Sequence, residues 1–128
     1  RTITEAVAEL IAGEHAAGLA DGSAWRGFAG AIDAARERLR ALLTKFDEQG
    51  LCGAGYGAPA KATTLMYQYA LDARCLDYIV DDSPLKQGLF SPGFGIPILT
   101  NEHARGNPTD FMFVLCWNFA EPILRNNC

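Results

Sequence analysis

The segment from Gly53 to Lys61 combines closely spaced glycines with a lysine, a pattern that can bind an anion. Glycine lets the backbone turn sharply and lets its N–H groups approach a ligand, while the N-terminus of a following helix attracts negative charge. Gly53, Gly55 and Ala58 match the G-x-G-x-x-A pattern of dinucleotide-binding folds. The segment therefore predicts a turn from a strand into a helix, with a phosphate group as the expected ligand.

In this turn we expect the backbone amides of Gly55, Tyr56 and Gly57 to face the anion, with Lys61 close by on the helix. An alternative reading of the same residues involves no ligand. Glycine-rich turns also occur where a helix packs closely on a strand. Lys61 would then be a solvent-facing lysine.

Polar side chains follow two other predicted strands. The strand at 76–80 ends on Asp81, and the strand at 111–116 leads into Trp117 and Asn118. Because the carboxyl ends of parallel strands meet at one edge of a sheet, where ligands bind, we expect these residues to line one crevice. The candidate substrate-binding residues are Gly53, Gly55, Tyr56, Gly57, Lys61, Asp81, Ser83, Lys86, Gln87, Trp117 and Asn118.

Several of these candidates have an expected role. Lys86 would contribute charge to a diphosphate, and Gln87 would reach a phosphate or a sugar hydroxyl. Asn118 offers two donors and an acceptor beside the stacking surface of Trp117. Asp81 stands near the position of the ribose-binding acid of dinucleotide folds, or it caps the turn that follows it. The alternative for the whole set is a group of solvated loop residues.

Two helices and an alternating series of strands and helices must position these residues. Apolar residues at intervals of three and four predict a first helix with Thr2 at its capping position and a longer one from Ser23 to Phe46. Strands are predicted at 51–52, 76–80, 96–99 and 111–116, the last covered on both faces. The fold class is α/β, a Rossmann-like parallel sheet of about four strands preceded by two helices. We expect one domain over 1–128, with a helical lead-in at 1–47 and an α/β core at 48–128.

Composition argues against several classes of protein. The 128 residues are 49% hydrophobic and 20% charged, which suits one globular domain with a core. The net charge of −4 argues against a general nucleic-acid-binding protein. Four widely spaced cysteines give neither a zinc site nor a disulfide framework, so reduced thiols in the cytoplasm are expected. No apolar run is long enough to span a membrane, so no membrane partner is expected.

Several motifs, in order, resemble the C-terminal domain of the bacterial sugar C-methyltransferases. They are residues 56–61, the strand that ends on Asp81, residues 83–88, Pro92-Gly93 with 96–98, and residues 117–119. The resemblance covers nearly the whole chain. It implies an enzyme of three parts: a zinc-binding N-terminal piece, a central S-adenosylmethionine-binding domain, and this domain, which helps to hold a nucleotide-linked keto-sugar.

The resemblance also implies that the chain is a fragment of a longer methyltransferase. The sequence supplies no second glycine motif for S-adenosylmethionine and no cysteine cluster for zinc, so we expect neither cofactor in this fragment. We expect its partners to be the nucleotide-linked sugar and the S-adenosylmethionine-binding domain of the same longer chain, and no catalytic residue within it. Two alternatives stay open: an NAD-type dinucleotide-binding domain of an oxidoreductase, and a structural or interaction domain.

Overall fold

The computed structural model describes residues 4–127, so Thr2, the predicted cap of the first helix, lies outside the described residues, as does Cys128. Two compact units make up the chain, Arg1–Arg38 and Leu39–Cys128. The boundary falls inside a long helix. The candidate residues named above therefore all belong to the second unit.

The first unit contains α1 (Glu5–Ala16) and the beginning of α2 (Ser23–Glu48). Both helices confirm the predicted lead-in, although α1 continues through Gly13. Between the helices, the Asp21 carboxylate accepts a hydrogen bond from the Ser23 N–H at 2.9 Å, which fixes the turn that begins α2. Neither helix has a buried residue within the described part of the chain. The last turns of α2 belong with the α/β unit.

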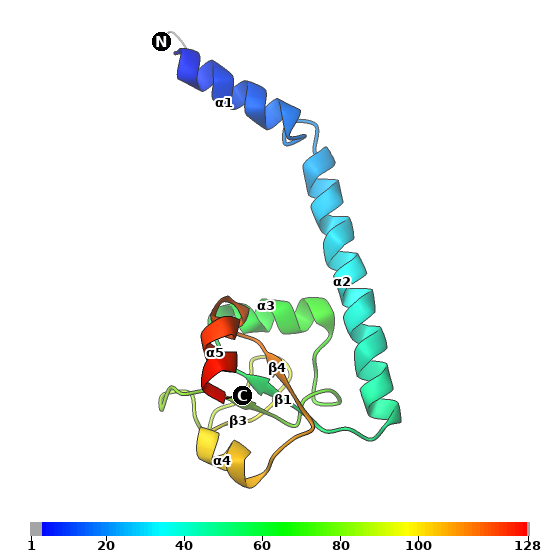
Figure 1. Ribbon diagram of the computed structural model, residues 1–128, viewed down its shortest axis with the longest axis vertical. Coiled ribbons are helices and arrows are strands. Elements are labelled where there is room, and N and C mark those ends of the chain that lie inside the picture. The colour runs from blue at the N-terminus through cyan, green and yellow to red at the C-terminus, as the bar shows by residue number, and fades with distance from the viewer. Residues whose placement is uncertain (1–3, 128) are drawn as a thin grey trace. The chain divides into compact units, whose positions relative to one another are not determined.

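The second unit contains a four-stranded parallel sheet, which confirms the predicted fold class (Figure 1). Its strands are β1 (Gly53–Tyr56), β2 (Tyr78–Val80), β3 (Ile98–Leu99) and β4 (Phe111–Val114). The order across the sheet is β3-β2-β1-β4. The strand order reverses between β1 and β4, which is the place where ligands bind in open α/β sheets.

Helices pack on both faces of this sheet: α3 (Ala60–Tyr69) on one and α4 (Asn101–Gly106) on the other (Figure 1). Because successive strand residues point to opposite faces, each face has its own core. The core under α3 contains Ala62, Met66, Leu71, Leu76, Ile79, Ile96, Ile98 and Leu115. On the opposite face Ala54, Tyr78 and Val80 pack together, next to Ala104 of α4. After β4, a short helical turn η1 (Trp117–Phe119) leads into α5 (Ala120–Asn127).

The glycine segment begins as a strand and not as a turn. The predicted strand at 51–52 was wrong in position, because β1 runs over Gly53–Tyr56 at the centre of the sheet. Gly55 is needed there for close packing, since a Cβ atom on it would lie 2.8 Å from Leu115 Cδ1 and 3.1 Å from Ile79 Cγ1. The backbone turns at Gly57, which has a φ of +85°.

The strand β4 also differs from its prediction. The apolar run was expected to be covered on both faces, but β4 lies at the edge of the sheet and Met112 is 42% exposed. The side chains of Phe111 and Phe113 pack against the core under α3. The apolar run therefore predicted the presence of a strand correctly, but the expectation that both faces of this strand are covered was wrong.

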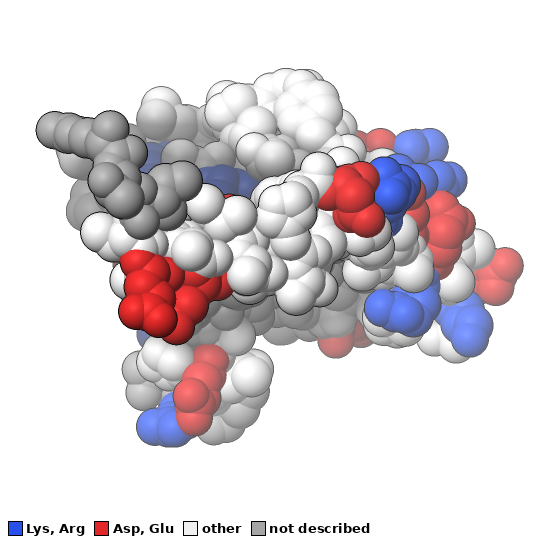
Figure 2. Space-filling view, turned by 90° about the horizontal axis from the view of Figure 1, so that it is seen from above, with Lys and Arg blue, Asp and Glu red and all other residues white. Residues whose placement is uncertain are grey.

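Charged side chains of both signs intermingle on the face shown in Figure 2. This distribution agrees with the small net charge of −4. None of the helices in residues 4–127 has the length and apolar character needed to cross a membrane.

Candidate functional site

A lysine, an asparagine and a tryptophan meet at the point where the strand order reverses. Lys61 lies in the first turn of α3, after β1, and Trp117 and Asn118 lie in η1, after β4. The Lys61 ammonium donates a hydrogen bond to Asn118 Oδ1. The same ammonium lies 4.9 Å from the centroid of the Trp117 ring, within the range of a cation–π contact. The structure thus brings Lys61 together with the neighbouring residues Trp117 and Asn118, although 57 positions separate Lys61 from Asn118.

These three side chains lie at the surface. Trp117 is 59% exposed, and the Lys61–Asn118 hydrogen bond is exposed to solvent. An exposed ion-to-amide contact contributes little to stability, because water competes for both groups. The arrangement presents a cation, amide donors and an aromatic ring, all accessible to a ligand.

A second group of candidates gathers around the carboxylate of Asp81, directly after β2. Asp81 is 8% exposed. Its Oδ2 accepts hydrogen bonds from the Ala58 N–H at 2.6 Å and from the Lys86 ammonium at 3.1 Å, and its Oδ1 accepts one from the Ser83 N–H at 2.9 Å. Gln87 donates to the Asp81 backbone carbonyl at 2.9 Å. Asp81 therefore fixes both the loop after β2 and the turn before α3.

The pKa of Asp81 results from two opposed effects. Burial acts to raise the pKa, but the hydrogen bonds from the Ala58 and Ser83 amides and the charge of Lys86 outweigh it and lower the pKa. Asp81 is therefore a carboxylate at neutral pH. A negative group of the chain itself lies at the turn before α3, where the sequence predicted an external anion.

This placement corrects the expected anion site. The Gly57 N–H donates to the Val80 carbonyl at 2.6 Å, and the Ala58 N–H donates to Asp81. Gly55 and Tyr56 pair with strands on both sides of β1. The prediction that the amides of Gly55, Tyr56 and Gly57 face an anion was wrong, because the sheet and Asp81 already occupy this part of the backbone.

Cys116 was not among the predicted site residues, although it lies between the two groups. Its thiol donates to the Tyr56 carbonyl at 3.4 Å, and its Cβ lies 2.8 Å from where a Cβ on Gly57 would be. Burial raises the pKa of the Cys116 thiol, and the nearby carboxylates of Asp81 and Asp82 act in the same direction. The thiol is therefore neutral, and it packs against the backbone at Tyr56 and Gly57. The sequence alone could not predict this position of Cys116, because the pairing of β1 with β4 brings Cys116 next to Tyr56 and Gly57.

Metal binding has no visible basis in this part of the molecule. Within residues 4–127 no group of three or more histidine, cysteine or acidic side chains is placed to hold a metal ion. The cysteines Cys52, Cys75 and Cys116 are free thiols.

Comparison with known proteins assigns a family to the whole chain. The sequence matches the family described as "C-methyltransferase C-terminal domain" over residues 1–128. It is 36% identical over 124 residues to the C-methyltransferase NovU of Streptomyces niveus, and the match covers 97% of this chain. The chain spans 30% of the length of that relative. The chain belongs to the family of C-methyltransferase C-terminal domains.

Proposed function

We propose that this chain is the part of a C-methyltransferase that holds a nucleotide-linked sugar substrate. The observation that carries the proposal is the meeting of Lys61, Trp117 and Asn118 where the strand order reverses between β1 and β4. Such a ligand has a diphosphate, hydroxyl groups and a planar base. A cation, an amide and an exposed aromatic ring match these three kinds of group.

Each of the three residues has a defined part in this proposal. Lys61 exchanges its bond with Asn118 for a phosphate oxygen, which is a stronger acceptor because it is charged. The freed amide of Asn118 then bonds a hydroxyl or the edge of the base. The base stacks on the exposed surface of Trp117. Lys86 adds positive charge from the neighbouring loop, where it already balances Asp81.

The oxidoreductase alternative has no support from the family match, and the structure argues against it. In dinucleotide folds the acid after the second strand binds a ribose hydroxyl, and free amides at the first turn bind the pyrophosphate. Here Asp81 accepts three hydrogen bonds from its own chain, including one from the Ala58 amide of that turn. Neither dinucleotide contact is free to form.

The other components of the reaction belong, in this proposal, to a longer polypeptide in the cytoplasm. The family is that of a C-terminal domain, and the relative is more than three times as long as the matched region. S-adenosylmethionine would be held by another domain of the same polypeptide and would supply the methyl group. A zinc-binding piece would likewise lie outside residues 1–128. This chain would then bind and orient the sugar, and the catalytic base would come from elsewhere.

Binding measurements on the 128-residue chain test the proposal. In a titration followed by NMR amide shifts, deoxythymidine diphosphate should shift residues around Lys61 and Asn118, and thymidine should bind about tenfold more weakly because it lacks the charge. Lys61→Gln should remove most of this difference. Lys45→Gln, which removes the same charge from the exposed surface of α2, should not. Equal binding of both ligands, or shifts confined to other parts of the sheet, would refute the proposal.

A further inference from the structure

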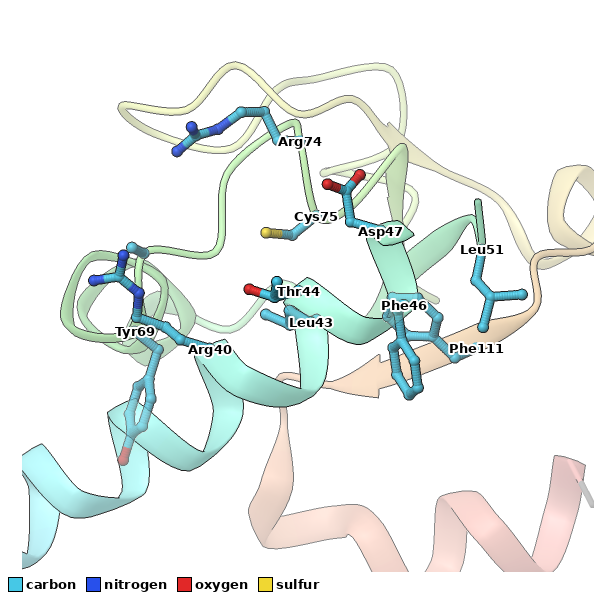
Figure 3. Close-up of a pocket in the computed structure, with 11 residues that line it drawn as sticks. Arg40, Leu43, Thr44, Phe46, Asp47, Leu51, Tyr69, Arg74, Cys75 and Phe111 are labelled. Atoms are coloured by element: carbon cyan, nitrogen blue, oxygen red, sulfur yellow. The ribbon is translucent and has the colours of Figure 1, made fainter. Parts of the chain in front are cut away.

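A separate cavity of about 270 Å³ lies at the opposite edge of the sheet, beside the amino ends of β1 and β4 (Figure 3). It lies wholly within the second unit. Its walls come from the last turns of α2, the end of α3, the turn before β2 and the start of β4. None of the residues of the proposed sugar site lines this cavity. Its volume is slightly below the range of about 300–1,000 Å³ that holds drug-sized ligands, so a ligand with a single ring is the appropriate size.

One end of the cavity is aromatic. The rings of Phe46 and Phe111 lie 4.7 Å apart between centroids, at 41° to each other. Gly53, the first glycine of the sequence motif, allows this arrangement, because a Cβ on it would overlap the Phe111 ring and would lie 2.6 Å from the Cys75 carbonyl oxygen. Gly53 thus shapes this cavity and not the carboxyl edge of the sheet, to which the sequence motif assigned it.

The other end of the cavity is cationic. Figure 3 shows Arg40 and Tyr69 on the side away from Phe46 and Phe111, with Thr44 between the two ends. Within residues 4–127 no hydrogen bond or ion pair engages the Arg40 guanidinium. An arginine fork of this kind binds a carboxylate through two hydrogen bonds.

The other two charged residues of the cavity, Arg74 and Asp47, lie away from Arg40 in Figure 3. Arg74 is engaged by Asp72, with its Nη2 at 2.8 Å from the carboxylate, and the charge of Asp47 also acts on Arg74. Burial raises the pKa of the Cys75 thiol, which is therefore uncharged at neutral pH. Positive charge without a partner is thus concentrated at Arg40, at the polar end.

We propose that this cavity binds a small molecule in which one apolar ring carries a carboxylate on a short chain. The ring lies against Phe46 and Phe111, and the carboxylate binds Arg40. The ligand would touch α2, α3 and β4 together, and would therefore hold the end of α2 against the sheet. The site is independent of the sugar site, because the two lie at opposite ends of the strands.

A matched pair of probes tests this site in the 128-residue chain. 3-Phenylpropionate and 3-phenylpropionamide have the same ring and chain length and differ in charge. The carboxylate should bind with a dissociation constant in the range of about 1 mM, as expected for so small a ligand, and should shift the NMR amide signals of Ala70, Cys75 and Phe111. The amide should bind about fivefold more weakly.

Two variants and one control make the outcome decisive. Arg40→Gln should weaken binding of the carboxylate about fivefold and leave binding of the amide unchanged, whereas Lys45→Gln on the same helix should affect neither. Thr44→Trp, a change at an exposed position of α2, should fill the cavity and abolish binding of both probes. The proposal is overturned if Arg40→Gln binds the carboxylate as well as the parent does, if the shifts lie elsewhere, or if neither probe binds.

Discussion

Asp81→Asn is the substitution that tests most sharply how the loops at the carboxyl edge are held. Asparagine keeps the shape of the side chain but replaces one acceptor oxygen with an NH₂ group. In the parent, Oδ2 accepts from the Ala58 N–H at 2.6 Å and from Lys86 at 3.1 Å, while Oδ1 accepts from the Ser83 N–H at 2.9 Å. In either orientation the new NH₂ group faces at least one donor of the chain.

The cost can be worked out contact by contact. A buried donor left facing another donor loses about 1–3 kcal/mol. The ion pair with Lys86 adds no more than about 1 kcal/mol, because the Lys86 side chain is 40% exposed and water screens it. We therefore expect the free energy of unfolding to fall by about 1–4 kcal/mol, with a decrease in Tm of at least about 4 °C.

The direction of the Asp81 pKa shift determines how the loss of stability in Asp81→Asn changes with pH. The pKa of Asp81 is lower in the folded chain than its ordinary value of about 3.9. The stability contributed by its charge is therefore present above that ordinary value and is lost as the pH falls through the folded pKa. The difference in unfolding free energy between parent and Asp81→Asn should be largest near neutral pH and should shrink on acidification.

Urea unfolding followed by circular dichroism measures this difference. Asp77→Asn is the matched control, because Asp77 is an exposed aspartate just before β2. If Asp81→Asn is as stable as Asp77→Asn at neutral pH, or if the difference grows on acidification, the reasoning about Asp81 is refuted.

Four further substitutions test the packing of the glycine segment and of the edge strand by the same urea measurements. Gly57→Ala should cost about 2–4 kcal/mol, because it places a Cβ at a φ of +85° and 2.8 Å from Cys116 Cβ. Combining it with Cys116→Gly should cost less than the sum of the two single changes, and strict additivity would contradict the contact. Gly55→Val should cost about 1–3 kcal/mol through crowding in the sheet alone, and a neutral result would show that the sheet can open there. Met112→Thr should change stability by less than about 0.5 kcal/mol, since Met112 is 42% exposed, and a large loss would mean that the outer face of β4 is covered.

The sequence was sufficient to predict the layers of the fold and the order of its helices and strands. Amphipathic spacing identified α2, whose observed range is Ser23–Glu48, and the alternation of strands and helices predicted the parallel sheet. The rule that strand ends meet at one edge correctly placed Lys61 and Asn118 near each other, although 57 positions separate them. These features follow from the local spacing of apolar residues and from the order of helices and strands along the chain, both of which can be read from a single sequence.

The roles of the glycines could not be predicted in the same way. A glycine that is needed for close packing cannot be distinguished in the sequence from a glycine that lets a ligand approach the backbone. The residues that pack against each glycine come from distant parts of the chain, so only the fold shows which role it has. Gly55 faces Leu115, Gly53 faces Phe111 and Gly57 faces Cys116, all of them residues of β4 or close to its end. Likewise, the segment before Asp81 identifies a strand end, but only the fold reveals that its carboxylate binds the Ala58 amide.

Steady-state kinetics of Lys61→Gln in the intact methyltransferase test the central proposal most directly. Lys86 is less suitable for this purpose, because it also pairs with Asp81 and its loss would mix binding with stability. Lys61 would contact the diphosphate equally in the ground and transition states, so its loss should raise the KM for the nucleotide-linked sugar about tenfold and leave kcat and the KM for S-adenosylmethionine unchanged. An unchanged KM for the sugar, or an effect confined to S-adenosylmethionine, would contradict the assignment of this domain to the sugar substrate.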